Sequence, residues 1–273
     1  MDYDKNMYAF PSRVRFSETD QAGEVKLYEI LNYLQDCATF QTEDVGAGLN
    51  YMQQHHMAWM VSAWHIKILR YPSLGEEILV GTLPYKLKGV LGYRNFVMDT
   101  QKGERLVSAA SLWTLVDTQK GLPMRIPETL KEKYPLCMPL EETFGSRKIR
   151  LSEDEVFEKQ KPFSVQSHHM DSNQHVNNGK YIEIAQTFLP EGATHPDEVR
   201  IEYKKQARLG DRIVPMRNKT ERNGQEIFTV SLENEEGEKY CVTEFIFHCR
   251  ERNKRCLEEQ YMNKWQTSSG KSS

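Results

Sequence analysis

The chain contains the same succession of sequence features twice, which restricts it to folds built from two similar units. A Leu-Gly-acidic-x-Ile motif surrounds both Gly75 and Gly210, which are 135 positions apart. Further on, paired stretches of alternating apolar and polar residues flank a glycine in a charged turn, Gly103 in the first copy and Gly237 in the second, 134 positions apart. Because the offset stays nearly constant over about 45 residues, we interpret the two segments as a repeat rather than as a chance resemblance.

Each copy also contains an amphipathic helix ahead of its strands. The apolar residues at helical spacing are Leu27, Ile30, Leu31, Leu34 and Ala38 in the first copy, and Tyr181, Ile182, Ala185, Phe188 and Leu189 in the second. We expect the second helix to cover residues 176–189. A single helix with one apolar stripe needs a sheet to cover it. The sequence therefore predicts an α+β fold of two units, each an antiparallel sheet wrapped around a long helix, whose sheets join at their edges into one.

The stretch between the copies is rich in proline and charge. Residues 126–162 contain Pro127, Pro135, Pro139 and Pro162. We predict a first unit over residues 1–135, a linker over 136–160, a second unit over 161–252 and a tail over 253–273. The tail ends in QTSSGKSS, and this polar composition is typical of disorder.

Composition excludes several classes of protein. The net charge is -3 over 273 residues, which favours neither nucleic acid nor a membrane surface as a general partner. There is no apolar run long enough to cross a membrane, and the start MDYDKNMYAF lacks the apolar core of a signal peptide. The five cysteines form no CxxC pair, and no metal or nucleotide motif is present. We expect a cytoplasmic protein with no membrane insertion, no cofactor and no metal site.

The segment MDSNQHVNNGKY places Asp171, Asn173 and His175 at alternate positions just before the second helix. Histidine carries protons near neutral pH, and an amide can polarise a carbonyl or hold a water molecule. A carboxylate can fix the imidazole tautomer, and a helix start offers backbone N–H groups to a developing oxyanion. The residue types alone leave a second interpretation open, in which Asp171 caps the helix and Asn177 and Asn178 satisfy its free N–H groups.

These residues resemble those of the acyl-acyl carrier protein thioesterases of bacterial type, which have a tandem hot-dog fold. The similarity rests on the motif DSNQHVNNGKY and on first-half segments such as RFSETDQAGEVKLYEILNYLQD and ASLWTLVDTQKGLPMRIPE, and it extends from about Tyr8 to Arg250. The resemblance implies a hydrolase of fatty acid biosynthesis that releases fatty acid from an acidic acyl carrier protein. It also implies that Asp171, Asn173 and His175 carry catalysis.

The sequence departs from the family pattern on the following strand. Where the family has a glutamate, followed in plant members by a cysteine, the segment IEYKKQARLGD has Gln206 and Ala207. A cysteine mechanism is not available at this position. Because an amide can hold water but cannot take its proton, His175 or Asp171 would have to act as the base while Gln206 positions the water.

The first copy has no histidine at the position equivalent to His175, so we expect one active site per chain. The resemblance implies that the first copy forms the acyl tunnel, with its helix residues Leu27, Ile30, Leu31 and Leu34 among the substrate-binding residues. Asn177 and Asn178 are further candidates for substrate binding, since they follow the catalytic motif directly.

Three functions stay open at this stage. The main hypothesis is hydrolysis of acyl-acyl carrier protein. The alternatives are an acyl-CoA thioesterase with the same site, and a non-catalytic acyl-binding protein, which the amide of Gln206 keeps open. A tandem chain makes internally the pair that single units make by dimerising, so a monomer and a homodimer are both open, as is the preferred acyl chain length.

Overall fold

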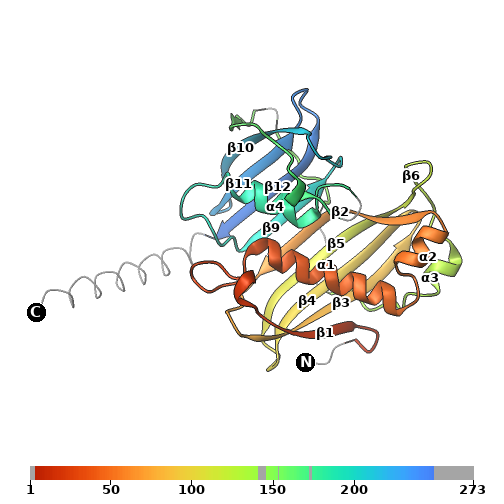
Figure 1. Cartoon of the computed structure of the whole chain (residues 1–273). Coiled ribbons are helices and arrows are strands. Elements are labelled where there is room, and N and C mark those ends of the chain that lie inside the picture. The colour runs from red at the N-terminus through yellow and green to blue at the C-terminus, as the bar shows by residue number, and fades with distance from the viewer. Residues whose placement is uncertain (1–3, 141–145, 153, 172–173, 249–273) are drawn as a thin grey trace, which may run out of the picture.

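The computed structural model describes residues 4–140, 146–152, 154–171 and 174–248. Its strands form one antiparallel sheet, which Figure 1 shows behind the helices. The strand order is β1 (Tyr8–Arg13), β3 (Glu77–Lys88), β4 (Leu91–Thr100), β5 (Arg105–Asp117), β2 (Met57–Ile68), β9 (Glu198–Tyr203), β12 (Lys239–His248), β11 (Gln225–Glu233), β10 (Arg212–Arg222) and β7 (Glu158–Lys159). The short strands β6 (Leu122–Pro123) and β8 (Phe163–Ser164) pair with β5 and β10.

The two copies of the repeat supply the two halves of this sheet. Strands β3, β4 and β5 begin 135, 134 and 134 positions before β10, β11 and β12. The halves join where β2 pairs with β9, in a register that sets Trp64 opposite Ile201. The predicted continuous sheet is therefore confirmed, and β2 and β9 form its centre.

The charged turns of the repeat reverse the chain in both halves. Gly103 has φ of 84° between β4 and β5, and Gly237 has φ of 82° between β11 and β12. Glycine adopts this left-handed conformation without the steric cost that a Cβ imposes. The glycine signal in the sequence thus marked two true hairpin turns.

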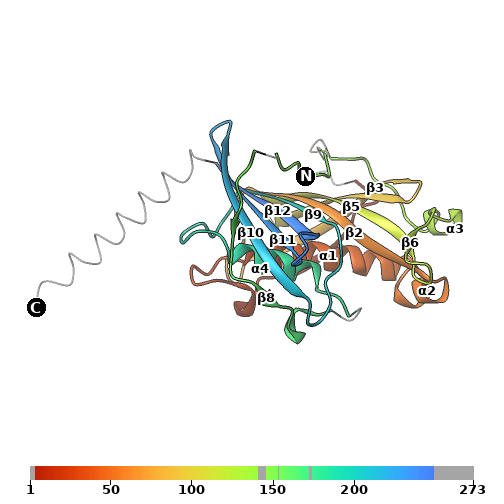
Figure 2. The ribbon, with the colours of Figure 1, turned by 90° about the horizontal axis from the view of Figure 1, so that it is seen from above.

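The helices cover one face of the sheet, as the view from above shows (Figure 2). They are α1 (Leu27–Asp44), α2 (Leu49–Gln54), α3 (Glu128–Lys131) and α4 (Asn178–Gln186), with short 3₁₀ turns at Phe16–Glu18 and Ser167–His169. Helix α4 is shorter than the predicted helix at both ends. Val176 forms an isolated bridge to Met170 and so belongs to the preceding loop. At the other end the chain reaches Pro190. A proline disfavours the helical conformation of the residue before it, which here is Leu189.

Helices α1 and α4 pack side by side. A Cβ added at Gly179 would lie 2.7 Å from Oδ1 of Asn32, so the absence of a side chain there permits the close approach. The Asn178 side chain donates from Nδ2 to Oε1 of Gln35 at 3.1 Å, which adds a polar contact across the same interface. Within the described ranges, no helix is both long enough and apolar enough to cross a bilayer.

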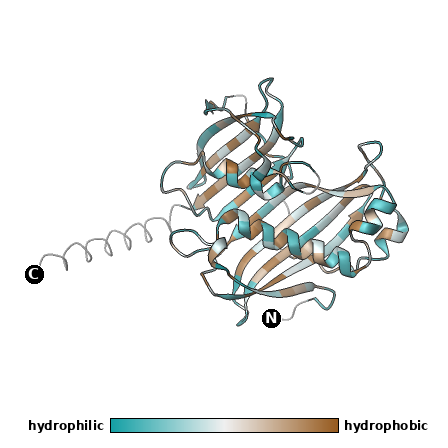
Figure 3. Ribbon diagram, viewed as in Figure 1, coloured by the Kyte–Doolittle hydropathy of each residue, from teal (hydrophilic) through white to brown (hydrophobic). Residues whose placement is uncertain are grey.

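The largest apolar core lies between the helices and the sheet. Polar residues dominate the outward side of α1, and apolar residues follow the strands behind it (Figure 3). Ile30, Leu31 and Leu34 are fully buried in this core, which continues into the second half through Ile182 and Ile201. The core is thus shared by both copies, because each helix alone covers only part of the joined sheet.

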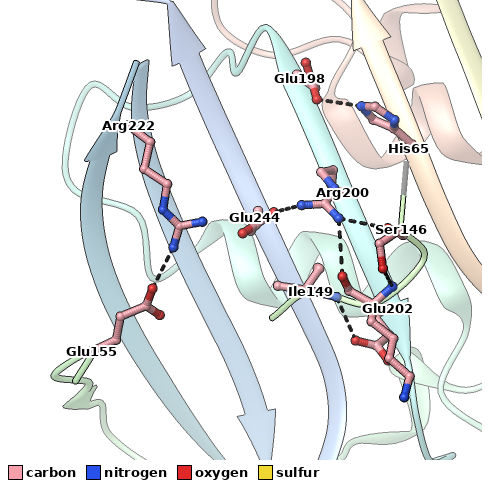
Figure 4. A network of polar contacts seen from close by, with 10 residues as sticks. His65, Ser146, Ile149, Glu155, Glu198, Arg200, Glu202, Arg222 and Glu244 are labelled. Atoms are coloured by element: carbon pink, nitrogen blue, oxygen red, sulfur yellow. Dashed lines mark hydrogen bonds and ion pairs between the residues drawn. The ribbon is translucent and has the colours of Figure 1, made fainter. Parts of the chain in front are cut away.

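Part of the predicted linker crosses the other face of the sheet. Val199 and Ile201 point into the core, so Arg200 and Glu202 between and beyond them point outward. Arg200 donates to the Ser146 carbonyl at 2.9 Å, and Glu202 accepts from the Ile149 N–H at 3.0 Å (Figure 4).

The linker also contains strand β7, which pairs with β10. It therefore takes part in the sheet rather than only connecting the halves. The domain boundaries stay a prediction, and the predicted tail, residues 253–273, lies outside the described residues.

Candidate active site

The loop that leads into α4 is closed by backbone hydrogen bonds. Asp171 donates its N–H to the His175 carbonyl at 2.8 Å, and Gln174 donates to the Asp171 carbonyl at 3.2 Å. The Asp171 carboxylate accepts from the His175 N–H at 3.3 Å. Asp171 therefore fixes the backbone position of His175.

His175 is half-buried at the end of this loop. Its Nδ1 atom is enclosed and has no hydrogen-bond partner in the described part of the chain. Buried polar atoms nearly always have a partner, and a catalytic role or a bound water can account for an exception. The predicted catalytic residue Asn173 lies outside the described residues, so its convergence with His175 stays a prediction.

The two asparagines after the motif have structural partners. Asn177 is the N-cap of α4, and its Oδ1 accepts from the Gly179 N–H at 2.8 Å. The alternative interpretation is thus right that an asparagine caps the helix, although the cap is not Asp171. Asn178 contacts α1 through Gln35. Substrate binding by Asn177 and Asn178 stays a prediction.

Gln206 lies in the loop after β9, next to the His175 loop. The Val176 N–H donates to the Ala207 carbonyl at 3.1 Å, and the Ala207 N–H donates to the Tyr181 hydroxyl oxygen at 2.8 Å. Burial raises the pKa of Tyr181, so the phenol stays neutral. These bonds bring the neighbours of His175 and Gln206 together, although the two residues are 31 positions apart in the sequence.

The side chain of Gln206 is exposed and reaches toward the first half of the molecule. Its Nε2 donates to Sδ of Met60 on β2 at 3.7 Å. The site therefore lies at the junction of the two halves, where β2 meets β9. Sequence reasoning missed Met60 because no motif surrounds it and the contact depends on the pairing of strands from different copies.

A cavity of about 330 Å³ lies in the first half, and Met57, Ala58 and Trp59 of β2 form part of its wall. Its wall comprises Ala38, Thr39, Thr42, Glu43, Gly48, Leu49, Met52, Gln53, Met57, Ala58, Trp59, Pro84, Leu87, Gly92, Tyr93, Arg94, Trp113, Thr118 and Tyr134. Of the predicted tunnel residues, Ile30, Leu31 and Leu34 lie in the core and do not line this cavity, and Leu27 lines a different cavity of about 280 Å³. Their role in acyl binding stays a prediction.

The first half contains a loop with the same backbone bonds as the His175 loop. Asp20 donates to the Glu24 carbonyl at 2.8 Å, and Gly23 donates to the Asp20 carbonyl at 3.1 Å. Glu24 thus occupies the place of His175. His195, from the second half, lies with Nε2 3.0 Å from the Asp20 carboxylate and 3.3 Å from that of Glu24. The backbone geometry of the loop is repeated, but the first copy has Glu24 where the second has His175. One active site per chain stays a prediction.

Comparison with known proteins gives two family matches. Residues 5–134 match the acyl-ACP thioesterase N-terminal domain, and residues 152–248 match the acyl-ACP thioesterase C-terminal domain. Among named relatives, the oleoyl-acyl carrier protein thioesterase 2 of Arabidopsis thaliana is 23% identical over 67% of this chain, and the dodecanoyl-[acyl-carrier-protein] hydrolase of Cinnamomum camphora is 24% identical over 72%. These matches span 54% and 55% of the relatives' own lengths, so the chain covers just over half of each.

Solved structures show the same fold. An acyl-ACP thioesterase from Bacteroides thetaiotaomicron superposes with a TM-score of 0.79 at 20% identity, covering 89% of this chain and 98% of the other. The 12:0-ACP thioesterase from Umbellularia californica gives a TM-score of 0.76 at 18% identity, covering 88% and 93%. The predicted tandem hot-dog fold is confirmed by these two likenesses.

Proposed function

The chain belongs to the acyl-ACP thioesterase family, and from this premise we propose that it hydrolyses acyl-acyl carrier protein to free fatty acid and carrier protein in fatty acid biosynthesis. The observation that carries the proposal is the hydrogen bond from Val176 to Ala207, because it holds His175 and Gln206 in adjacent loops.

In the proposed reaction, a water oxygen bonds to the thioester carbon and the carbon–sulfur bond breaks. His175 takes the proton from water and returns it to the departing thiolate. The first N–H groups of a helix have no acceptor within the helix. The Asn177 side chain accepts a hydrogen bond from the Gly179 N–H. The Asn178 N–H is then left to stabilise the oxyanion at the positive end of α4.

Gln206 holds the attacking water in this scheme. Its amide offers a donor and an acceptor but no base, so proton transfer falls to His175. Asp171 keeps His175 in place through the two bonds that close the loop. Asn173 is proposed to polarise the thioester carbonyl or to orient the water.

The acidic carrier protein would dock beside Gln206. Lys205 and Arg208 are exposed on the same loop. Lys205 pairs with Glu238 at 2.5 Å, whereas Arg208 forms no ion pair with any residue that the structure describes. An exposed cation without a fixed partner is available to an acidic surface, and such attraction weakens as salt screens it.

Parallel assays with matched acyl chains on acyl carrier protein and on CoA test this proposal. We expect kcat/KM to be higher for the carrier protein, and to fall with added salt for that substrate more than for CoA. Equal or higher kcat/KM for CoA would favour an acyl-CoA thioesterase. Binding of acyl chains without hydrolysis of either thioester would favour the non-catalytic acyl-binding protein, for which the amide at Gln206 is the specific observation.

Replacing Gln206 with glutamate is expected to raise kcat by about tenfold or more, because a carboxylate adds a general base at the position that holds water. The gain should disappear at low pH, where the new carboxyl group is protonated and can no longer accept a proton. Steady-state rates across pH measure both effects.

The matched control for this prediction is Gln206→Ala, which removes the amide without supplying a base. Its rate should fall below that of the wild type. If the alanine variant keeps the wild-type rate, Gln206 does not position the water.

A further inference from the structure

The first-half cavity contains a buried arginine with no acidic partner. Arg94 on β4 is 8% exposed. Its Nη1 donates to Oε1 of Gln41 at 2.5 Å and to Oγ1 of Thr82 at 3.0 Å. Neither acceptor carries charge, and Arg94 forms no ion pair with any described residue. A guanidinium that is buried without a counter-ion is destabilising unless something else supplies the charge.

The hydrogen bonds around Arg94 leave only donors unsatisfied. Its Nε and Nη2 donate to no residue in the described ranges. Nε2 of Gln41 is buried, and it also lacks a partner there. Burial lowers the pKa of Arg94, yet a guanidinium stays protonated in proteins. The cluster therefore lacks an acceptor that carries negative charge.

The cavity is otherwise suited to an acyl chain. Arg94 lies with its guanidinium 5.8 Å from the ring of Tyr134, and Trp59 and Trp113 form apolar parts of the same wall. The other charged residue of the wall is Glu43, which is exposed at the rim and contacts the Leu49 N–H rather than Arg94. Solvent screens that charge, so the inner part of the cavity is positive.

Arg94, a wall residue of this cavity, lies two strands away from the junction. Strand β5 separates β4 from β2, which carries Met60 and contacts Gln206. Two strand spacings place Arg94 roughly 10 Å across the sheet from β2. A chain attached at the junction would therefore present its far end, and not its thioester, to the guanidinium.

We propose that this cavity binds acyl chains whose far end carries a carboxylate, which accepts hydrogen bonds from Nε and Nη2 of Arg94. The inference rests on the proposed function for the thioester end of the substrate. A carboxylate is favoured over a hydroxyl because the two free donors lie on one edge of the planar guanidinium, and a carboxylate accepts from both at once. It also supplies the missing negative charge.

Kinetic measurements on the wild-type enzyme test the proposal first. Two acyl-acyl carrier protein substrates of equal chain length are compared, one ending in a carboxylate and one in a methyl group, over a series of lengths. At the length that reaches Arg94, we expect kcat/KM for the carboxylate substrate to exceed that of shorter carboxylate chains by about tenfold to a hundredfold. An ω-hydroxy chain should show less of this gain.

Arg94→Met and Arg94→Lys then assign the effect to the guanidinium. Arg94→Met should abolish the preference for a carboxylate end over a methyl end. Arg94→Lys should retain part of this preference, because lysine keeps the positive charge but lacks the paired donors of the guanidinium. If the ω-hydroxy chain gains as much as the carboxylate, or if the preference survives in Arg94→Met, the proposal is overturned.

A binding measurement separates this proposal from the proposed function. Calorimetry with monomethyl sebacate and with methyl decanoate needs no hydrolysis, and Trp59 and Trp113 give a fluorescence signal in the same cavity. We expect the sebacate monoester to bind at least tenfold more tightly. Tight binding without thioesterase activity would overturn only the proposed function. Hydrolysis of ordinary acyl thioesters with equal binding of the two probes would overturn only this inference.

Discussion

Replacing His175 with alanine is expected to lower kcat by about 10² to 10⁴-fold, which is the range that general acid–base catalysis contributes. The imidazole stands at the end of a loop that Asp171 closes, and its Nδ1 is enclosed without a partner among the described residues. Alanine keeps the backbone bonds of the loop and removes only the proton carrier. KM should change much less, since we propose that the acyl chain binds in the other half.

The matched control is His168→Ala, at an exposed histidine of the preceding 3₁₀ turn that lies outside the motif. Its kcat should stay close to that of the wild type. Both variants should unfold at similar temperatures, because neither side chain belongs to the core. A His175→Ala enzyme with more than a tenth of the wild-type kcat would contradict the assignment of His175 as the general base.

The strands and hairpins could be predicted because the sequence signals for them lie within each strand and turn. Alternating residues and the turn glycines Gly103 and Gly237 define the hairpins without any knowledge of the partner strand. The constant offset between copies then predicts the symmetry of the joined sheet. The pairing of β2 with β9 follows from the same symmetry, because each is the innermost strand of its half.

The length of α4 could not be read from the apolar pattern. Val176, Phe188 and Leu189 continue the helical spacing at both ends of α4 but lie outside it. Val176 bridges to Met170 because closing the His175 loop takes priority over extending the helix. The spacing of the apolar residues shows which face of α4 is buried. The hydrogen bonds of the His175 loop decide where α4 begins.

The candidate site was only partly predictable for a related reason. The motif at Asp171 and His175 is contiguous and therefore visible in the sequence. The contact of Gln206 with Met60 crosses between copies, and the cavity wall takes residues from α1, α2 and four strands. Arg94 gives no signal in the sequence, because a strand arginine normally faces solvent and only the fold reveals that this one is buried.

The second large effect is expected for the stability of the joined sheet. Arg200→Met should lower the free energy of unfolding by about 3 kcal/mol, the lower end of the cost of breaking a buried ion pair. Arg200 donates to the Glu244 carboxylate at 2.6 Å, and the side chain of Glu244 is only 4% exposed (Figure 4). The cost arises because the Glu244 side chain would remain buried without its partner. Equilibrium unfolding in urea measures it.

Two further variants identify the cause of this loss. Replacing both partners, Arg200→Met with Glu244→Leu, should recover most of the stability, since no buried charge then remains. The part that is not recovered measures the bond from Arg200 to the Ser146 carbonyl, which both variants lack. Arg212→Met is the matched surface control: its pair with Glu235 is more than half exposed, so its loss should cost about 0–1 kcal/mol. If Arg200→Met costs no more than Arg212→Met, the ion pair between β9 and β12 does not contribute to the stability of the sheet.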